Sequence, residues 1–261
     1  MGILSWRGAA SLEYALSTYE RAGLFDLFDE RAIVLPEPDE AVRSIAARHP
    51  LQAHEFSKNL GIAGGMQAVA EALTTDYVLF LENDCPLIES LHEAKTQIDL
   101  SLKALEANAC FMVRLRSRRE PGELFDTFGK YKRYWDNGLG PRVRRLLRPK
   151  KALRLSGTAI YALPHPHKRH PDVITQYNDD SVIVSPKVMP WTNQSILLKR
   201  RDFLDIILPH VTAQPLTRAI NGFHNIEIEL NRSKFWTESD FKILCPKGLF
   251  THKRLGDRGY K

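Results

Sequence analysis

Strand-like and helix-like segments alternate through the first 113 residues, and this alternation limits the chain to a small set of folds. The clearest strand, residues 76–81, shows no polar–apolar alternation and is apolar from Tyr77 onward, which is typical of a strand buried on both faces of a parallel sheet. The other strand-like segments are 3–6, 31–35, 52–56 and 110–113, and helical spacing of apolar residues marks 9–28, 41–48, 66–73 and 88–108. This order predicts an α/β fold with a doubly wound, mostly parallel central sheet flanked by helices.

The regular alternation weakens after residue 113. Residues 114–190 are predicted to form loops and short helices, because neither strand nor helix periodicity is sustained there. Regular structure returns as strands at 193–198 and 241–244 and as helices at 201–208 and 225–232. We therefore expect one domain over residues 1–261, made of a first half (1–113), an irregular basic segment (114–190) and a C-terminal half (191–261).

Several polar residues directly follow predicted strands. Open α/β sheets bind ligands beyond the carboxyl ends of their strands, so Glu37, Asn59 and the Glu82–Asp84 stretch are expected to converge on one rim. Two carboxylates one residue apart can hold a hard divalent cation between the protein and a diphosphate. Glu82 and Asp84 are thus candidate Mn²⁺ or Mg²⁺ ligands, although acids after a strand also commonly cap turns.

The net charge of +6 conceals a strong asymmetry. Residues 114–154 contain 14 Lys or Arg against four acids, so the rest of the chain is mildly acidic. Residues 142–154 hold seven cations interleaved with Val143, Leu146 and Leu147, a pattern typical of an amphipathic surface-binding helix. An anionic membrane, a charged glycan or glycolipid acceptor, and a solvated face remain alternatives. The upstream aromatic residues Tyr131, Tyr134 and Trp135 suit either sugar stacking or a core.

Membrane-spanning and secreted classes are not favoured. No apolar run approaches 18 residues, the first residues lack the pattern of a signal peptide, and the three cysteines are odd in number and far apart. These features predict a cytoplasmic protein, with peripheral attachment to the inner face of a membrane as an option. The prolines around His165, His167 and His170 favour an extended, solvated loop over a metal site.

Residues 58–65, a short helix, and the strand ending in Glu82-Asn83-Asp84 resemble the GT-A nucleotide-sugar glycosyltransferases, most of all the family-two type. Those enzymes carry an N-x-G turn, a helix and a strand ending in a D-x-D motif, whose first acid is Glu82 here. Residues 190–201 resemble the strand and following element that precede the acceptor site. Residues 226–230 resemble the E-D-x-D-L motif, with Ile226 in place of its first Glu. The resemblance covers about 110 to 130 residues in separate blocks.

This resemblance implies a GT-A fold and transfer of a sugar from a nucleoside-diphosphate sugar to a hydroxyl of a glycan or glycolipid, with inversion. Residues 1–113 would bind the nucleotide sugar, and residues 191–261 would supply acceptor and catalytic groups. Glu227 would be the base that takes the acceptor proton, while Mn²⁺ or Mg²⁺ would neutralise the leaving diphosphate. The implied nucleotide contacts are Trp6, Arg7, Glu37, Asn59, Gly61, Asn83 and Lys253, and the implied metal ligands are Glu82, Asp84 and His252.

Two other functions compete with this one. A sugar-1-phosphate nucleotidyltransferase also uses an α/β sheet and acidic metal ligands, but its Gly-x-Gly-x-Arg loop is replaced here by Trp6-Arg7-Gly8-Ala9-Ala10. An RNA-binding protein would use the basic segment, yet no RNP, KH or zinc-knuckle pattern occurs. The expected partners are therefore a nucleotide sugar and its acceptor, without nucleic acid.

Overall fold

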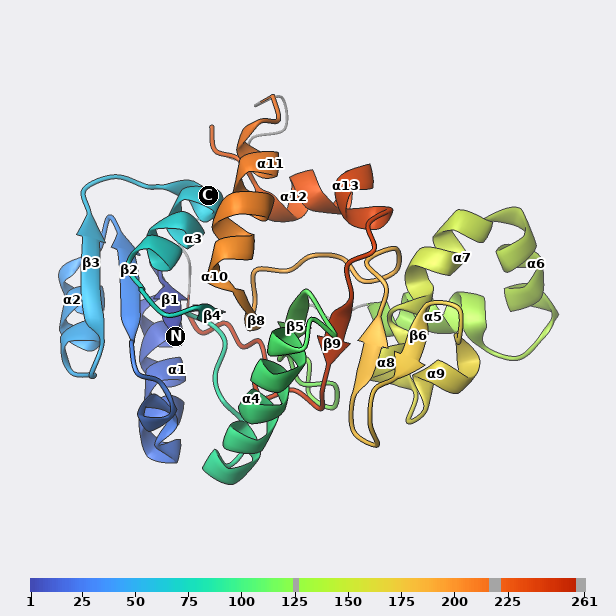
Figure 1. Ribbon diagram of the computed structural model, residues 1–261, viewed down its shortest axis with the longest axis horizontal. Coiled ribbons are helices and arrows are strands. Elements are labelled where there is room, and N and C mark those ends of the chain that lie inside the picture. Colours follow the sequence, from blue (N-terminus) through green and yellow to red (C-terminus); the bar gives the residue numbers. More distant parts are fainter. Residues whose placement is uncertain (124–126, 216–221, 257–261) are drawn as a thin grey trace.

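A nine-stranded sheet runs through the computed structural model, which describes residues 1–123, 127–215 and 222–256 (Figure 1). Its strand order is β3-β2-β1-β4-β8-β5-β9-β7-β6. The strands are β1 (Gly2–Leu4), β2 (Ala32–Pro36), β3 (Gln52–Phe56), β4 (Tyr77–Glu82), β5 (Met112–Arg114), β6 (Ile174–Gln176), β7 (Val182–Val184), β8 (Ile196–Lys199) and β9 (Ile243–Cys245). The predicted α/β class is thus confirmed.

The parallel part of the sheet consists of β3, β2, β1 and β4, and the remainder is mixed. β1 pairs in parallel with both β2 and β4, as the βαβ pattern predicts. β8 then inserts between β4 and β5 and runs antiparallel to both. Because β8 comes from the last third of the sequence, its insertion brings the loop that precedes it, residues 190–195, to the rim where β4 ends.

Helices cover both faces of the sheet, and alternation along the strands sends side chains into two separate cores. Ile33 and Leu35 pack under α1 (Ala9–Ala22), α2 (Glu40–Ala47) and α4 (Leu91–Glu106). Val34, between them, packs under α3 (Gly61–Glu71) on the other face. The remaining helical elements around these cores are η1 (Leu24–Leu27), α10 (Arg200–Asp202), the π-helix η2 (Phe203–Ile207), α11 (Leu208–Thr212), α12 (Ile226–Asn231) and α13 (Lys234–Thr237).

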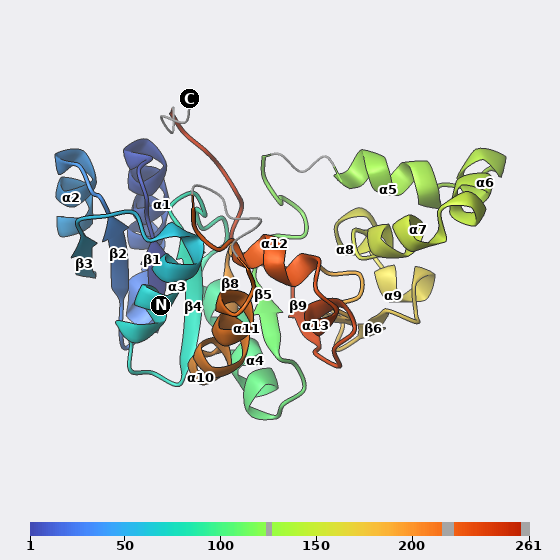
Figure 2. The same ribbon diagram turned by 90° about the horizontal axis from the view of Figure 1, so that it is seen from above.

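The segment 114–190 is more regular than its sequence indicates. It forms the helices α5 (Thr127–Trp135), α6 (Leu139–Leu147), α7 (Pro149–Ser156), α8 (Ala159–Ala162) and α9 (Pro166–Arg169), followed by the hairpin β6–β7. Both ribbon views place α5, α6 and α7 at the end of the molecule farthest from β3 (Figures 1 and 2). We call residues 127–156 the basic arm.

Two expectations for this segment were wrong. The single amphipathic helix over 142–154 is broken into α6 and α7, because Pro149 disfavours helical backbone at Arg148, whose φ and ψ are −137° and 61°. The predicted solvated loop around His170 is instead a helical turn, and His170 is buried with its Nε2 3.0 Å from the hydroxyl of Tyr131. Tyr131 and Tyr134 belong to the core.

Within the described ranges, no helix is long and apolar enough to cross a membrane. Cys85, Cys110 and Cys245 are buried free thiols, which agrees with the absence of a disulfide pattern in the sequence.

Candidate active site

Asp84 lies immediately beyond the end of β4, and its side chain is fully buried. Its Oδ2 atom is 3.0 Å from Nε2 of His252 and 3.2 Å from Nε of Arg254. A carboxylate buried this deeply needs cationic or hydrogen-bonding partners, and both of these come from the C-terminal segment. The structure therefore brings together two of the three predicted metal ligands.

The C-terminal segment reaches Asp84 because it runs beside the chain that leaves β4. Thr251 N–H donates to Pro86 O (3.1 Å), and Lys253 N–H donates to Asp84 O (2.9 Å). In an extended chain alternate side chains point the same way, so His252 and Arg254 both face Asp84. The side chain of Lys253 turns away, and its Nζ lies 4.7 Å from the centre of the Tyr14 ring.

The imidazole of His252 is held from both sides. Its Nδ1 lies 3.3 Å from the carbonyl oxygen of Glu123, while Nε2 faces Asp84. Glu123 N–H in turn donates to His252 O at 2.9 Å, which fixes the two loops against each other. Gly122 makes this approach feasible, because its φ is +86° and a Cβ there would lie 2.1 Å from His252 O.

This arrangement fits a divalent cation. A metal-binding histidine usually donates one ring N–H to a carbonyl or carboxylate, which aims the other nitrogen at the metal, and Glu123 O provides such an acceptor. Imidazole nitrogen together with carboxylate oxygen suits Mn²⁺ better than Mg²⁺. Glu82 is half-buried at the end of β4, and the described residues contain no group of three or more metal-ligating side chains. The predicted set of Glu82, Asp84 and His252 is therefore not assembled as a triad.

A second cluster joins the ends of β1 and β2. Trp6 Nε1 donates to Oε2 of Glu37 at 3.3 Å, and the Arg7 guanidinium lies 4.7 Å from the centre of the Trp6 ring. Asn83 links the cluster to β4, since its amide donates to Arg7 O at 2.6 Å. Arg7 and Glu37 both have positive φ, 56° and 48°. Such strained backbone outside glycine gathers at functional sites, and the rim predicted from the strand ends is present.

The Asn59 turn is positioned by the C-terminal half. Oδ1 of Asn59 accepts the Gly61 N–H at 2.8 Å, so it shapes the turn that starts α3. Gly61 has a φ of +64°, and a Cβ there would lie 2.4 Å from Cβ of Phe223. Phe223 precedes α12, so the turn predicted to bind the nucleotide packs against the approach to the predicted catalytic helix.

Glu227 lies in the first turn of α12, whose N-cap is Asn225. Its Oε1 accepts the backbone N–H of Asn193 at 3.1 Å. Asn231, on the next turn, accepts from Trp191 N at 2.6 Å and donates to Trp191 O at 3.0 Å. These contacts fix α12 to the loop that enters β8, so Glu227 borders the same rim as the end of β4.

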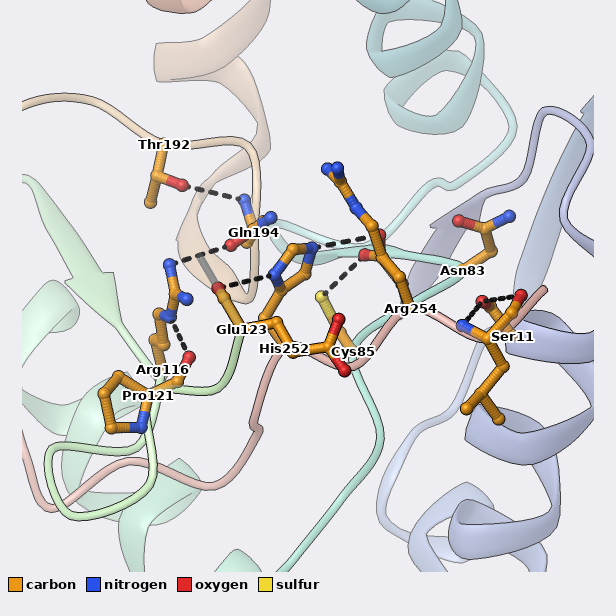
Figure 3. Close-up of polar contacts among 12 residues, drawn as sticks. Ser11, Asn83, Cys85, Arg116, Pro121, Glu123, Thr192, Gln194, His252 and Arg254 are labelled. Carbon is orange, nitrogen blue, oxygen red and sulfur yellow. Dashed lines mark hydrogen bonds and ion pairs between the residues drawn. The ribbon is translucent and has the colours of Figure 1, made fainter. Parts of the chain in front are cut away.

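Three further residues border this rim although the sequence did not predict them as site residues: Arg116, Gln194 and Arg254. Arg116 donates to Pro121 O at 2.6 Å and to Oε1 of Gln194 at 3.1 Å (Figure 3). Burial, reinforced by the neighbouring Arg114, lowers the pKa of Arg116. For Arg116, the sequence does carry a signal. Arginines alternate at 114, 116 and 118 directly after a predicted strand, which places three cations on one strand face.

Cys85 and Tyr19 lie behind Asp84. The Tyr19 hydroxyl donates to Cys85 O at 2.6 Å, and the Cys85 thiol lies 3.9 Å from Oδ1 of Asp84. Burial, followed by the charge of Asp84, holds the pKa of the Cys85 thiol well above its usual range. Cys85 is therefore a neutral supporting group that orients the carboxylate, not a nucleophile.

Three features together define a GT-A fold. They are the parallel half β3-β2-β1-β4, an antiparallel strand inserted beside β4, and an acid at the end of β4 that faces a C-terminal histidine. Solved structures agree. The chain is similar to S. aureus TarS 1–349 at a TM-score of 0.50 and 8% identity, covering 97% of this chain and 60% of that one. It is also similar to a mannosyltransferase from Pyrobaculum calidifontis, solved with GDP-Man and Mn²⁺, at a TM-score of 0.50 and 13% identity, covering 99% and 58%.

Structural similarity at 8% and 13% sequence identity establishes the fold. The chain spans about 60% of the length of these two structures. Searches with protein-family models and of curated protein sequences found no match.

Proposed function

We propose that the protein is a glycosyltransferase that moves a sugar from a nucleoside-diphosphate sugar to a hydroxyl of a glycan or glycolipid, with inversion and with Mn²⁺ or Mg²⁺ as cofactor. The observation that carries this proposal is the buried Asp84 carboxylate at the end of β4, paired with His252 from the C-terminal segment. The GT-A fold and the mannosyltransferase structure with GDP-Man and Mn²⁺ support it.

The donor would bind across the ends of β1, β2 and β4. Trp6 and Arg7 offer an aromatic face and a cation, and Glu37 an acceptor for base or ribose groups. Asn83 and the turn at Asn59 and Gly61 would border the diphosphate.

Asp84 and His252 would hold the divalent cation, and Glu82 remains the third proposed ligand although the three are not assembled as a triad. When bound, the metal neutralises the charge that develops on the leaving diphosphate. Arg254 already places a cation against Asp84, and Lys253 adds a second positive charge to the same segment. We assign Arg254 to the electrostatics of diphosphate departure, and Lys253, whose side chain lies against Tyr14, to the proposed nucleotide contacts.

Glu227 would act on the acceptor. The acceptor oxygen forms a bond to the anomeric carbon, and the bond from that carbon to the diphosphate breaks with the electron pair leaving on the diphosphate. The proton of the acceptor hydroxyl passes to the Glu227 carboxylate. The hydrogen bond from Asn193 N–H holds one carboxylate oxygen, and this leaves the other for the incoming hydroxyl.

A thermal-shift panel tests the proposal. The intact chain is heated with UDP, GDP or dTDP, each without metal, with Mn²⁺ and with Mg²⁺, and one nucleotide should stabilise it only with a metal. At about 100 times its dissociation constant, such a ligand adds about 2.7 kcal/mol to the free energy of unfolding. Failure of every nucleotide with every divalent ion would overturn the proposal. Release of pyrophosphate from a nucleoside triphosphate and a sugar 1-phosphate would favour a nucleotidyltransferase instead.

A further inference from the structure

The proposed donor site leaves the basic arm, residues 127–156, without a role. α6 is its outermost helix in both ribbon views, and none of its residues is buried (Figures 1 and 2). Helices of globular proteins normally bury an apolar stripe, so a helix that buries nothing calls for an external partner.

Large apolar side chains of α6 face outward. Leu139, Val143, Leu146 and Leu147 are 78%, 51%, 81% and 76% exposed. Their spacing of i, i+4, i+7 and i+8 places them within a stripe about 100° wide along one side of the helix. A contiguous exposed apolar surface of this kind marks an interaction site.

The opposite side of α6 is fastened to the rest of the arm. Arg145 donates to Tyr134 O, and its guanidinium lies 5.1 Å from the centre of the Trp135 ring. Arg144 donates to Arg133 O at 3.2 Å. These contacts orient the helix against α5, and they direct the apolar stripe away from the protein.

The charge around this stripe has one sign. Residues 137–171 contain nine Lys or Arg and no acid. Within the described part of the chain, no cation between residues 142 and 154 makes an ion pair. The surface therefore complements an anionic partner electrostatically, while the stripe requires that partner to offer an apolar phase as well.

We propose that the basic arm docks on an anionic phospholipid bilayer, with α6 lying in the plane of the interface. The four apolar side chains of the stripe enter the acyl boundary, and the surrounding arginines and lysines remain among the headgroups, as in interfacial amphipathic helices. An RNA partner would need exposed aromatic platforms. In the arm Tyr131 and Tyr134 are buried, and Trp135 donates its indole N–H to Ala152 O at 3.0 Å.

Vesicle flotation with the intact chain tests this docking. The protein should float with vesicles of phosphatidylcholine mixed with phosphatidylglycerol and should not float with phosphatidylcholine alone. Added salt should weaken the binding, because screening shortens the reach of the cations. Equal binding to both vesicle types, or to neither, would overturn the proposal.

Two double variants separate the contributions. Leu146→Ser with Leu147→Ser removes half of the stripe, and Arg142→Gln with Arg148→Gln removes two cations; each should weaken vesicle binding at least tenfold. The matched controls are Ile206→Ser, at a side chain 37% exposed outside the arm, and Lys95→Gln with Lys103→Gln on α4. The controls should bind vesicles like the wild type. All variants should keep the wild-type melting temperature.

The same samples distinguish a membrane from other binding partners of α6. A dimer that Leu146→Ser with Leu147→Ser dissociates in light scattering would make α6 an interface between copies and would overturn membrane docking. Salt-dependent binding of a single-stranded RNA oligonucleotide without vesicle binding would overturn it too. Nucleotide stabilisation in Mn²⁺ should be unchanged in the arm variants, so failure of docking is distinguishable from failure of the glycosyltransferase proposal.

Discussion

Nε2 of His252 lies 3.0 Å from Oδ2 of Asp84, although 168 residues separate the two in the chain. Asp84 follows β4, the last strand of the parallel half of the sheet, and His252 belongs to a segment that follows the last strand of the chain. Their contact closes the fold over the rim at which β1, β2 and β4 end. Stability and ligand binding should therefore respond together to changes at this pair.

Replacing Asp84 by Asn keeps the shape of the side chain and removes its charge. Without the carboxylate, His252 and Arg254 lose a buried partner, so the free energy of unfolding should fall by about 3 kcal/mol. Stabilisation by nucleotide and Mn²⁺ should also disappear in a thermal-shift titration. The control Asp99→Asn removes an acid that is 50% exposed on α4, and it should change neither quantity. Retained Mn²⁺-dependent stabilisation in Asp84→Asn would show that the metal site lies elsewhere.

Replacing Glu227 by Gln keeps an oxygen for the Asn193 N–H and removes the proposed base. Turnover of the donor sugar should fall by about 10² to 10⁴, while nucleotide stabilisation in Mn²⁺ stays within error of the wild type. Glu238→Gln changes an exposed acid on α13's C-terminal side and serves as the control. Wild-type turnover in Glu227→Gln would remove this residue from the role of base.

Replacing Gly122 by Ala should displace His252 without touching its chemistry. The new Cβ would meet His252 O, and alanine is strained at a φ of +86°. We expect a loss of about 2 kcal/mol in chemical denaturation and a weaker response to Mn²⁺. Gly129→Ala, inside α5 with nothing within 4 Å of the new Cβ, should instead gain roughly 0.5 to 1 kcal/mol. Equal effects of the two changes would contradict the close packing of Gly122.

Stability should decrease in acid through His170. Burial, followed by the charge of Arg169, lowers the pKa of His170 from an ordinary value of 6.5 to about 4. Between pH 6.5 and pH 4 the unfolded chain binds a proton at this histidine and the folded chain does not. The contribution of His170 to the free energy of unfolding that is present above pH 6.5 is therefore lost as the pH falls toward 4. The loss is at most about 3 kcal/mol.

Denaturation of the wild type and His170→Asn at several pH values measures this contribution. The variant retains a polar group for the Tyr131 hydroxyl, and its stability should depend less steeply on pH between 6.5 and 4. Identical slopes for the two proteins would exclude His170 as the titrating group.

Local sequence patterns were sufficient to predict the strands of the N-terminal half and the position of its rim. The uninterrupted apolar run of 77–81 indicates burial on both faces, and β4 ends at Glu82, next to the acids singled out from the sequence. Trp6 and Glu37 meet because parallel neighbouring strands end at the same edge. Periodicity reports such features because it depends only on residues close in sequence.

The structure of the middle and C-terminal parts depends on contacts between residues far apart in sequence, which periodicity does not encode. Arg148–Pro149 divides the basic stretch into two helices, and β6 and β7 form a hairpin where the sequence showed no strand pattern. Glu82 also stays outside any three-residue metal-ligating group in the described ranges, and Asp84 is the acid that contacts the C-terminal segment.

The sequence by itself determined the α/β class, the rim after β1, β2 and β4, and the single-signed charge of residues 137–171, because each depends on residue type and short-range spacing. Only the tertiary structure decided that Asp84 is buried between His252 and Arg254 and that Lys253 points away to Tyr14. The same holds for the outward stripe of α6. The Asp84 contacts arise when β8 and β9 insert into the sheet and draw the C-terminal segment beside the end of β4, and the stripe of α6 is turned outward by contacts with α5. Local preferences specify neither of these long-range arrangements.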